Sequence, residues 1–195
     1  ISHDDSPLPF ASDDSMMRSV SPLSDDVREK TGELVNDVAI DLLGLAAVAR
    51  KAHWNVRGLL FGQLHDLFGK LYDACSSQAD MLAEHAAMLG LSVRGDHAEI
   101  AKSAEADPIG EEKDGIELCS LLFDRIRATL SEIETARKEI QKLGNEDGFQ
   151  LVTDASITLS KFGWMIGAFV EDDVEGPETD KTSRSIPPNR APTDD

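Results

Sequence analysis

The chain has 195 residues, which is enough for one domain with a sizeable core. Its 37 acidic residues against 19 basic ones give a formal net charge of -18, and this disfavours a surface that binds duplex nucleic acid, because such a surface must neutralise phosphates. No apolar run reaches the roughly 18 residues needed to span a bilayer, so we expect a soluble protein with no membrane partner.

The two ends of the chain lack a hydrophobic period. Residues 1–22 mix Ser, Asp and Pro with scattered apolar residues, and residues 173–195 are polar and rich in proline. We expect a flexible N-terminal arm and a flexible C-terminal tail around one domain at 23–172. The chain starts with Ile1 rather than methionine, which leaves room for a removed leader, and the expected location is the cytoplasm.

Four segments carry apolar residues at spacings of three, four and seven, which place them on one helical face. The segments are 27–52, 60–89, 116–143 and 149–169. Ser24 is expected to cap the first helix, Gly90 and Gly144 to end the second and third, and the fourth starts behind Asn145. Cys75 and Cys119 fall on these stripes, so we expect buried structural thiols. Four helices of about thirty residues, roughly 40 to 50 Å long, form a four-helix bundle.

The connections between these segments predict the topology. The first and third connections are short, so each joined pair should form an antiparallel hairpin. The middle connection, about residues 91–112, is long enough to cross over along the bundle, and residues 96–106 within it have the composition of a short extra helix. An all-α bundle with one long crossover is the ferritin-like arrangement.

Two residue pairs could carry chemistry. Asp80 and Glu84 lie four apart on the second helix, so both carboxylates project from one face and can bind the same cation. His53 ends the first helix and His65 opens the second, so a hairpin can bring their imidazoles together. Each pair alone is more often a solvated surface feature. Together, imidazole and carboxylate suit redox chemistry on iron, whereas structural zinc more often takes thiolates.

The segment 51–90, KAHWNVRGLLFGQLHDLFGKLYDACSSQADMLAEHAAMLG, resembles the signature of the miniferritins, the Dps family. The matching positions are His53-Trp54-Asn55, Gly58, Phe61, His65, Asp80, Glu84 and Leu89-Gly90. The later segment KFGWMIGAFVED is similar to the fourth-helix signature of the family, with Trp164 in its aromatic position. The resemblance covers roughly residues 24 to 172.

This resemblance implies a homododecameric hollow shell with ferroxidase sites at its twofold interfaces. His53 and His65 of one subunit would face Asp80 and Glu84 of another. Ferrous iron would be oxidised, preferentially by hydrogen peroxide and otherwise by oxygen, and ferric mineral stored in the cavity would protect against oxidative stress. Zinc or another divalent cation could occupy the same site.

The resemblance also implies acid-lined threefold pores near the start of the fourth helix, through which iron would enter. Glu146, Asp147 and Asp154 are the candidates in this chain. A solvated helix N-terminus favours acids for its own electrostatic reasons, so both interpretations stay open.

Three positions need separate interpretation. Many relatives carry an acid four positions after the second histidine, where this chain has Gly69, so occupancy of the second iron position is open. Arginine usually follows the glutamate, but here the residue is His85, which is either a solvent or interface histidine or an additional metal ligand. Trp54 either packs the hairpin turn or quenches stray oxidising equivalents.

Several family members condense DNA through lysine-rich arms. The N-terminal arm has Arg18 as its only basic residue, and acids accompany the basic residues of the C-terminal tail, so we expect DNA binding to be weak. Two alternatives to an iron-oxidising storage protein remain. One is a protective or nucleoid-associated shell with a vestigial or non-iron metal site, and the other is a helical bundle that binds zinc or another cation without turnover.

Overall fold

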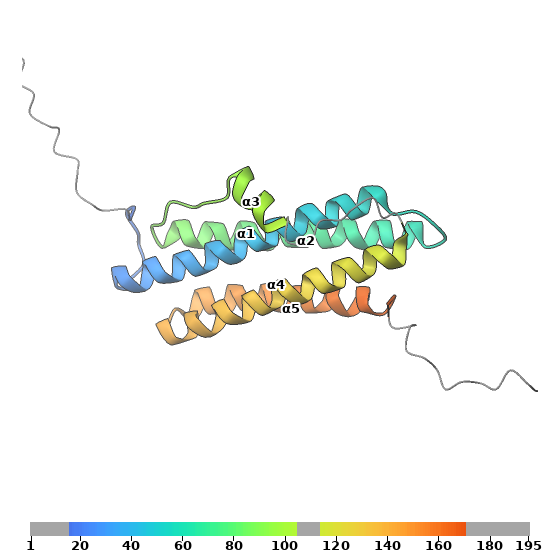
Figure 1. Cartoon of the computed structure of the whole chain (residues 1–195). Coiled ribbons are helices and arrows are strands. Elements are labelled where there is room, and N and C mark those ends of the chain that lie inside the picture. The colour runs from blue at the N-terminus through green and yellow to red at the C-terminus, as the bar shows by residue number, and fades with distance from the viewer. Residues whose placement is uncertain (1–15, 105–113, 171–195) are drawn as a thin grey trace, which may run out of the picture.

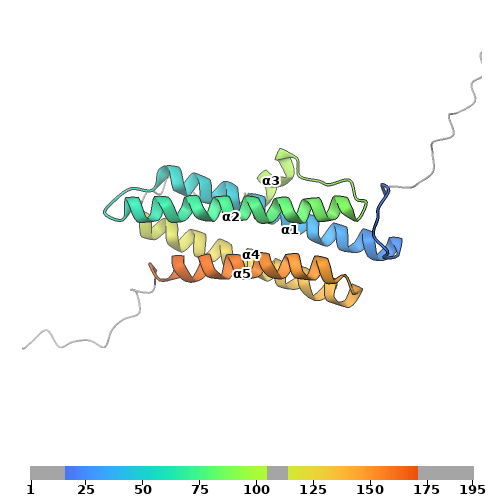
Figure 2. The same cartoon turned by 180° about the vertical axis from the view of Figure 1, so that it is seen from behind.

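The computed structural model describes residues 16–104 and 114–170. Its helices are α1 (Asp25–Asn55), α2 (Phe61–Met88), α3 (His97–Ala104), α4 (Gly115–Leu143) and α5 (Glu146–Gly167). The hairpin of α1 and α2 forms one layer and the hairpin of α4 and α5 the other, as Figure 1 shows from one side and Figure 2 from behind. The prediction of an all-α, ferritin-like four-helix bundle is confirmed.

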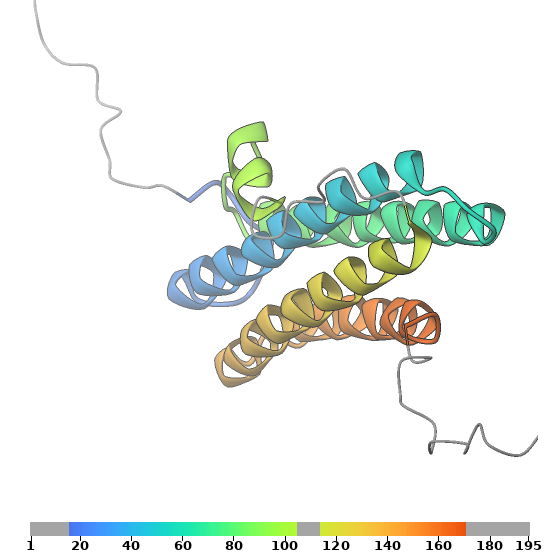
Figure 3. The ribbon, with the colours of Figure 1, turned by 45° about the vertical axis from the view of Figure 1, so that its right-hand side comes forward.

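The middle connection crosses from one end of the bundle to the other, as predicted. It leaves α2 beside the α4–α5 turn, carries α3 along the outside of α1, and enters α4 beside the α1–α2 turn (Figure 3). Asn36, which is buried, holds its start, because its amide donates to the Arg94 carbonyl at 2.9 Å and its side-chain oxygen accepts from the Arg94 N–H at 2.8 Å. Its other end is held by a β-bridge between Arg57 and Asp114.

The helix α3 packs against α1 and α4. Its Ser103 hydroxyl donates to Asp41 at 2.9 Å, and the buried Arg125 guanidinium donates to the Ser103 carbonyl at 2.6 Å. Gly44 makes this approach feasible, since a Cβ there would lie 2.6 Å from the Ser103 hydroxyl oxygen. Helix α3 confirms the expected extra helix, and residues 105 and 106 of that prediction lie outside the described ranges.

The helix ends partly follow the predicted caps. The Asn145 side chain accepts from the Gly148 N–H at 2.7 Å, and Gly144 ends α4 in the left-handed conformation at φ 74°. Ser24 precedes α1 but its hydroxyl makes no capping hydrogen bond. Asp114, which the sequence analysis did not single out, caps α4 by accepting from two backbone N–H groups. Helix α5 is also shorter than expected, at 22 residues.

The core fills the space between the two hairpins with aliphatic side chains, Phe68 and Phe162, most of which come from the inner faces of the four long helices. Cys75 and Cys119 belong to this core and are free thiols. Desolvation by burial raises the pKa of each thiol to about 12, so both stay protonated at neutral pH. The expectation of structural thiols is therefore supported.

Residues 16–24 form a strap over the C-terminal end of α2. The Met17 N–H donates to the Gly90 carbonyl at 2.7 Å, and the Ser19 hydroxyl donates to the Met88 carbonyl at 2.6 Å. Arg28 at the start of α1 adds a 2.7 Å bond to the Leu89 carbonyl. Three backbone carbonyls at and just after the end of α2 thus have hydrogen-bond partners. The rest of the predicted arm, residues 1–15, and all of the predicted tail lie outside the described ranges. Within those ranges no helix is both long and apolar enough to cross a bilayer.

Candidate metal site

The α1–α2 hairpin brings His53 and His65 into direct contact, as its predicted geometry requires. The two imidazole rings are stacked, with centroids 3.7 Å apart and planes inclined by 22°. The hydrogen bonds of the pair are reciprocal: His53 Nδ1 lies 2.7 Å from the His65 carbonyl oxygen, and His65 Nδ1 lies 2.9 Å from the His53 carbonyl oxygen. Each ring is therefore held by the backbone of the other residue.

These hydrogen bonds fix which nitrogen can bind a metal. A backbone carbonyl can only accept, so each Nδ1 must carry the proton and donate. In the neutral imidazole, Nε2 then keeps its lone pair on both rings. A histidine that donates one ring nitrogen to a carbonyl while offering the other is the usual arrangement in protein metal sites. Both rings are half-buried, and the pair offers two nitrogen donors whose tautomers are already set.

One aromatic ring contacts the histidine pair, and two others lie against Arg50 of α1. The Phe61 ring lies 5.1 Å from the His65 ring. The Arg50 guanidinium lies 5.4 Å from the Trp54 ring centroid and 5.2 Å from that of Tyr72, both within cation–π range. Trp54 is 62% exposed, so it does not pack the hairpin turn within one chain, contrary to that alternative of the sequence analysis.

Asp80 and Glu84 lie on the exposed surface of α2, away from the histidines. They are 15 and 19 residues beyond His65 in one continuous helix, which puts them about 22 and about 28 Å along its axis. In the described part of the chain, no three His, Cys, Asp or Glu side chains lie close enough to hold an ion together. One chain therefore brings together each predicted pair but not the two pairs.

His85 differs from its neighbour Glu84 because it points into the bundle. A step of one residue turns about 100° around a helix, and the His85 side chain is only 8% exposed. It faces the start of α5, where a Cβ on Gly148 would lie 3.3 Å from its Nε2. Burial lowers the pKa of His85 from its ordinary value of 6.5, while the nearby Asp147 carboxylate and the Asn145 side chain oppose the shift. The expectation of a solvent histidine is wrong for this chain.

The pore candidates lie in the same end of the bundle as His85. Glu146 and Asp147 are exposed in the first turn of α5. Asp154 is half-buried about two turns further on, and its carboxylate accepts from the Gln150 amide at 2.8 Å. Asp147 and Asp154 share one face of the helix, because seven residues are nearly two full turns. Whether this face lines a pore depends on other copies and stays a prediction.

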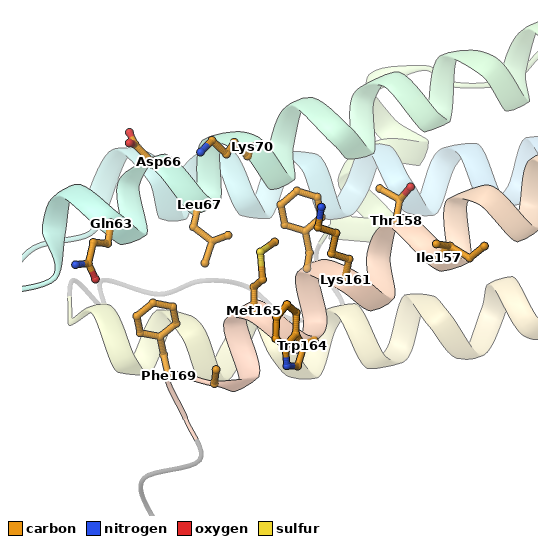
Figure 4. A pocket seen from close by; sticks show the side chains of 12 residues that line it. Gln63, Asp66, Leu67, Lys70, Ile157, Thr158, Lys161, Trp164, Met165 and Phe169 are labelled. Atoms are coloured by element: carbon orange, nitrogen blue, oxygen red, sulfur yellow. The ribbon is translucent and has the colours of Figure 1, made fainter.

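A groove of about 880 Å³ lies away from these residues, between the first half of α2 and the second half of α5. Figure 4 shows Leu67 of α2 and Met165 of α5 facing each other across it. Its charged lining residues are Asp66, Lys70 and Lys161, a set with more positive than negative charge that is unsuited to holding iron.

The chain is similar to a known protein family and to several of its members. The family described as "Ferritin-like domain" matches residues 33–174, which include most of α1, all of α2 to α5 and both candidate pairs. Among proteins with this similarity are two named "DNA protection during starvation protein". The one from Brevibacillus brevis is 28% identical over 148 residues, which cover 74% of this chain and 97% of that protein. The one from Mycolicibacterium smegmatis is 27% identical over 155 residues, which cover 78% of this chain and 84% of that protein.

Solved structures share the fold at lower identity. DpsC from Streptomyces coelicolor has a TM-score of 0.75 at 23% identity, covering 84% of this chain and 94% of that one. A Dps structure from Vibrio cholerae O1, described as a member of a broad superfamily of ferritin-like diiron-carboxylate proteins, has a TM-score of 0.72 at 22% identity. It covers 80% of this chain and 98% of that one.

Proposed function

Because this chain belongs to the ferritin-like family and, within it, to the Dps miniferritins, we propose that it oxidises ferrous iron at sites shared between two copies and stores the ferric product inside a dodecameric shell. The observation that carries this proposal is the separation of the donors. His53 and His65 form a preformed nitrogen pair, and Asp80 and Glu84 lie about 22 Å or more further along the same helix.

Two copies with antiparallel α2 helices resolve this separation. In a twofold arrangement, the histidine end of one α2 lies beside the carboxylate stretch of the other, and the reverse contact forms a second, identical site. Four donors then meet, two nitrogens and two carboxylates, which suits iron because imidazole binds transition metals and carboxylate oxygen tolerates both of its oxidation states.

The surface around each half supports a contact between copies. Large apolar side chains are exposed beside both donor pairs, Trp54 and Phe61 near the histidines, and Met81 and Met88 near the carboxylates. Aromatic residues and methionine are enriched at the cores of protein interfaces, and sulfur makes favourable contacts with aromatic rings. We therefore place these residues against the second copy.

The reaction proposed for this site is electron transfer from ferrous iron to an oxidant. Hydrogen peroxide accepts two electrons and, with two protons, yields two waters, so each molecule oxidises two ferrous ions. Oxygen is the alternative electron acceptor. The residues of this chain bind and orient the iron: Nε2 of each histidine supplies a neutral donor, and the two carboxylates supply the negative charge that stabilises the more highly charged ferric product.

Co-assembly of two inactive variants tests the shared site. A His53→Ala chain keeps its carboxylates and a Glu84→Ala chain keeps its histidines. When they are unfolded together and co-assembled, half of the dimers contain one of each, and one of the two sites in such a dimer is fully intact. We expect about a quarter of the wild-type rate of ferrous oxidation. Shells assembled separately and then mixed are the control, and should stay inactive.

If the co-assembled variants oxidise ferrous iron no faster than the separately assembled shells, the proposal is contradicted. Co-assembly cannot restore a site whose donors all come from one chain. The same assay is run with peroxide and with oxygen. Equal rates in the wild type and in both single variants, with either oxidant, would instead favour a shell whose metal site is vestigial.

The names of the relatives raise DNA protection as a second aspect. We propose that this chain protects through iron and oxidant consumption rather than by covering DNA, because its net charge of -18 opposes phosphate binding. In a gel-shift assay at physiological salt we expect no retarded plasmid. A clear shift would overturn this part of the proposal.

A further inference from the structure

The space above Gly69 is occupied by the His53 ring. Gly69 lies four residues after His65 in α2, on nearly the same face of the helix. A Cβ at this position would lie 3.1 Å from His53 Nδ1 and 3.2 Å from its Cε1. Both distances are shorter than ordinary van der Waals contact, so the ring would have to move if residue 69 had a side chain.

The ring has little freedom to move. Its Nδ1, the atom closest to the added Cβ, donates the 2.7 Å hydrogen bond to the His65 carbonyl. Its face is stacked on the His65 ring at 3.7 Å. A displacement of a few tenths of an ångström away from residue 69 therefore acts on the bond that fixes the proton on Nδ1 and on the direction in which Nε2 points.

We propose that Gly69 is a positioning residue for the candidate metal site, because its missing side chain leaves the space in which His53 can stack on His65 and bond to its backbone. In this chain, the Cβ of any side chain at this position would contact the His53 ring. The histidine half of the site then owes its two-nitrogen geometry to a glycine that touches no metal.

Gly62 provides a matched control in the same helix. It also lies in α2, and a Cβ there would meet nothing within 4 Å. Both Gly69→Ala and Gly62→Ala replace glycine by a better helix former, so neither is expected to lower the Tm or to prevent assembly. Any difference between the two variants then reports the contact with His53.

The test measures Co²⁺ binding to the assembled protein by calorimetry and by visible absorption, since Co²⁺ replaces Fe²⁺ without being oxidised. We expect Gly69→Ala to bind Co²⁺ at least about tenfold more weakly than the wild type, with altered absorption bands. Gly62→Ala should match the wild type. Wild-type affinity and spectrum in Gly69→Ala would overturn the role of Gly69.

Gly69 acts on the site of the proposed function, so a His53→Ala variant separates the two ideas. If the wild type shows no Co²⁺ binding that His53→Ala removes, the proposed metal site fails. If His53→Ala removes binding and Gly69→Ala does not, only the role of Gly69 fails.

A crystal structure of metal-free Gly69→Ala gives a readout that depends on neither metal nor assembly. The distance from His53 Nδ1 to the His65 carbonyl oxygen should lengthen by a few tenths of an ångström, to about 3.0 Å or more. A ring that keeps its 2.7 Å bond would contradict the positioning role.

Discussion

The two halves of the proposed iron site are built in different ways. His53 and His65 are half-buried, stacked and tied to each other's backbone. Asp80 and Glu84 are exposed, and in the described ranges neither makes a hydrogen bond or an ion pair. Under the proposed function, the histidine pair held by hydrogen bonds would set where the iron sits, and the two exposed carboxylates would be free to adapt as its charge changes.

Removing each half completely is expected to have the largest effect. The His53→Ala/His65→Ala and Asp80→Ala/Glu84→Ala double variants should both lose ferrous oxidation by more than about 100-fold, since changing only the residues that orient metal ligands already costs up to that much. Co²⁺ calorimetry should separate them, because the carboxylate variant keeps the preformed nitrogen pair and retains weak binding. Equal loss of Co²⁺ binding in both variants would show that the histidine pair does not bind the metal by itself.

Removing only a charge should have a smaller effect. Glu84→Gln keeps the size of the side chain but loses the negative charge that favours ferric iron, so we expect the oxidation rate to fall about tenfold, measured at saturating ferrous iron. Because Glu84 is exposed, the Tm should hardly change. Glu117→Gln, an exposed acid in α4, is the control and should oxidise iron at the wild-type rate. A drop in Tm for Glu84→Gln would mean that this carboxylate is already engaged in the metal-free protein.

The neighbour of Glu84 should affect stability and not oxidation. Burial lowers the pKa of His85 below 6.5, so between that lowered pKa and 6.5 the unfolded chain binds a proton that the folded chain does not. The stability of the metal-free protein therefore falls as pH drops through this window. His85→Gln should reduce the loss of Tm between about pH 7.5 and about pH 5.5, seen by calorimetry, with unchanged ferrous oxidation at neutral pH. A slower oxidation in assembled His85→Gln shells would assign His85 to the metal site after all.

The smallest effect is expected from thiol alkylation at Cys75, which lies on α2 between the two halves of the site but is buried in the core. Burial raises the pKa of this thiol, and that of Cys119, to about 12. Iodoacetamide at about pH 8 should therefore leave both thiols of the native protein unmodified and alkylate both in urea. Rapid alkylation of the native protein would show that the core opens between the halves.

The bundle could be predicted from sequence because apolar residues that recur at helical spacing mark the buried face of each long helix. The four apolar stripes give the four long helices, and the connection lengths give the two hairpins and the crossover. The proximity of His53 and His65 follows from the same hairpin. Their reciprocal hydrogen bonds do not, because these depend on the conformation of the turn between α1 and α2, which no spacing rule determines.

The surroundings of two other residues could be described only from the structure. His85 was interpreted as a solvent or interface histidine, although it lies about 40° around the helix from the buried Leu89 and therefore at the edge of the apolar stripe. That angle was a usable signal. Gly69 could be recognised from sequence only as a missing acid, because its contact with His53 crosses from one helix to another.

The distance between the donors on α2 also bears on the order of events in the cell. A newly synthesised chain that has not met a second copy holds a nitrogen pair at one place and a carboxylate pair about 22 Å away, and under the proposed function it cannot oxidise iron. Under the proposed function, oxidation begins only once two copies have paired, which is also a step toward the shell. Ferric iron, which precipitates readily, would then be produced by assembling subunits and not by single chains.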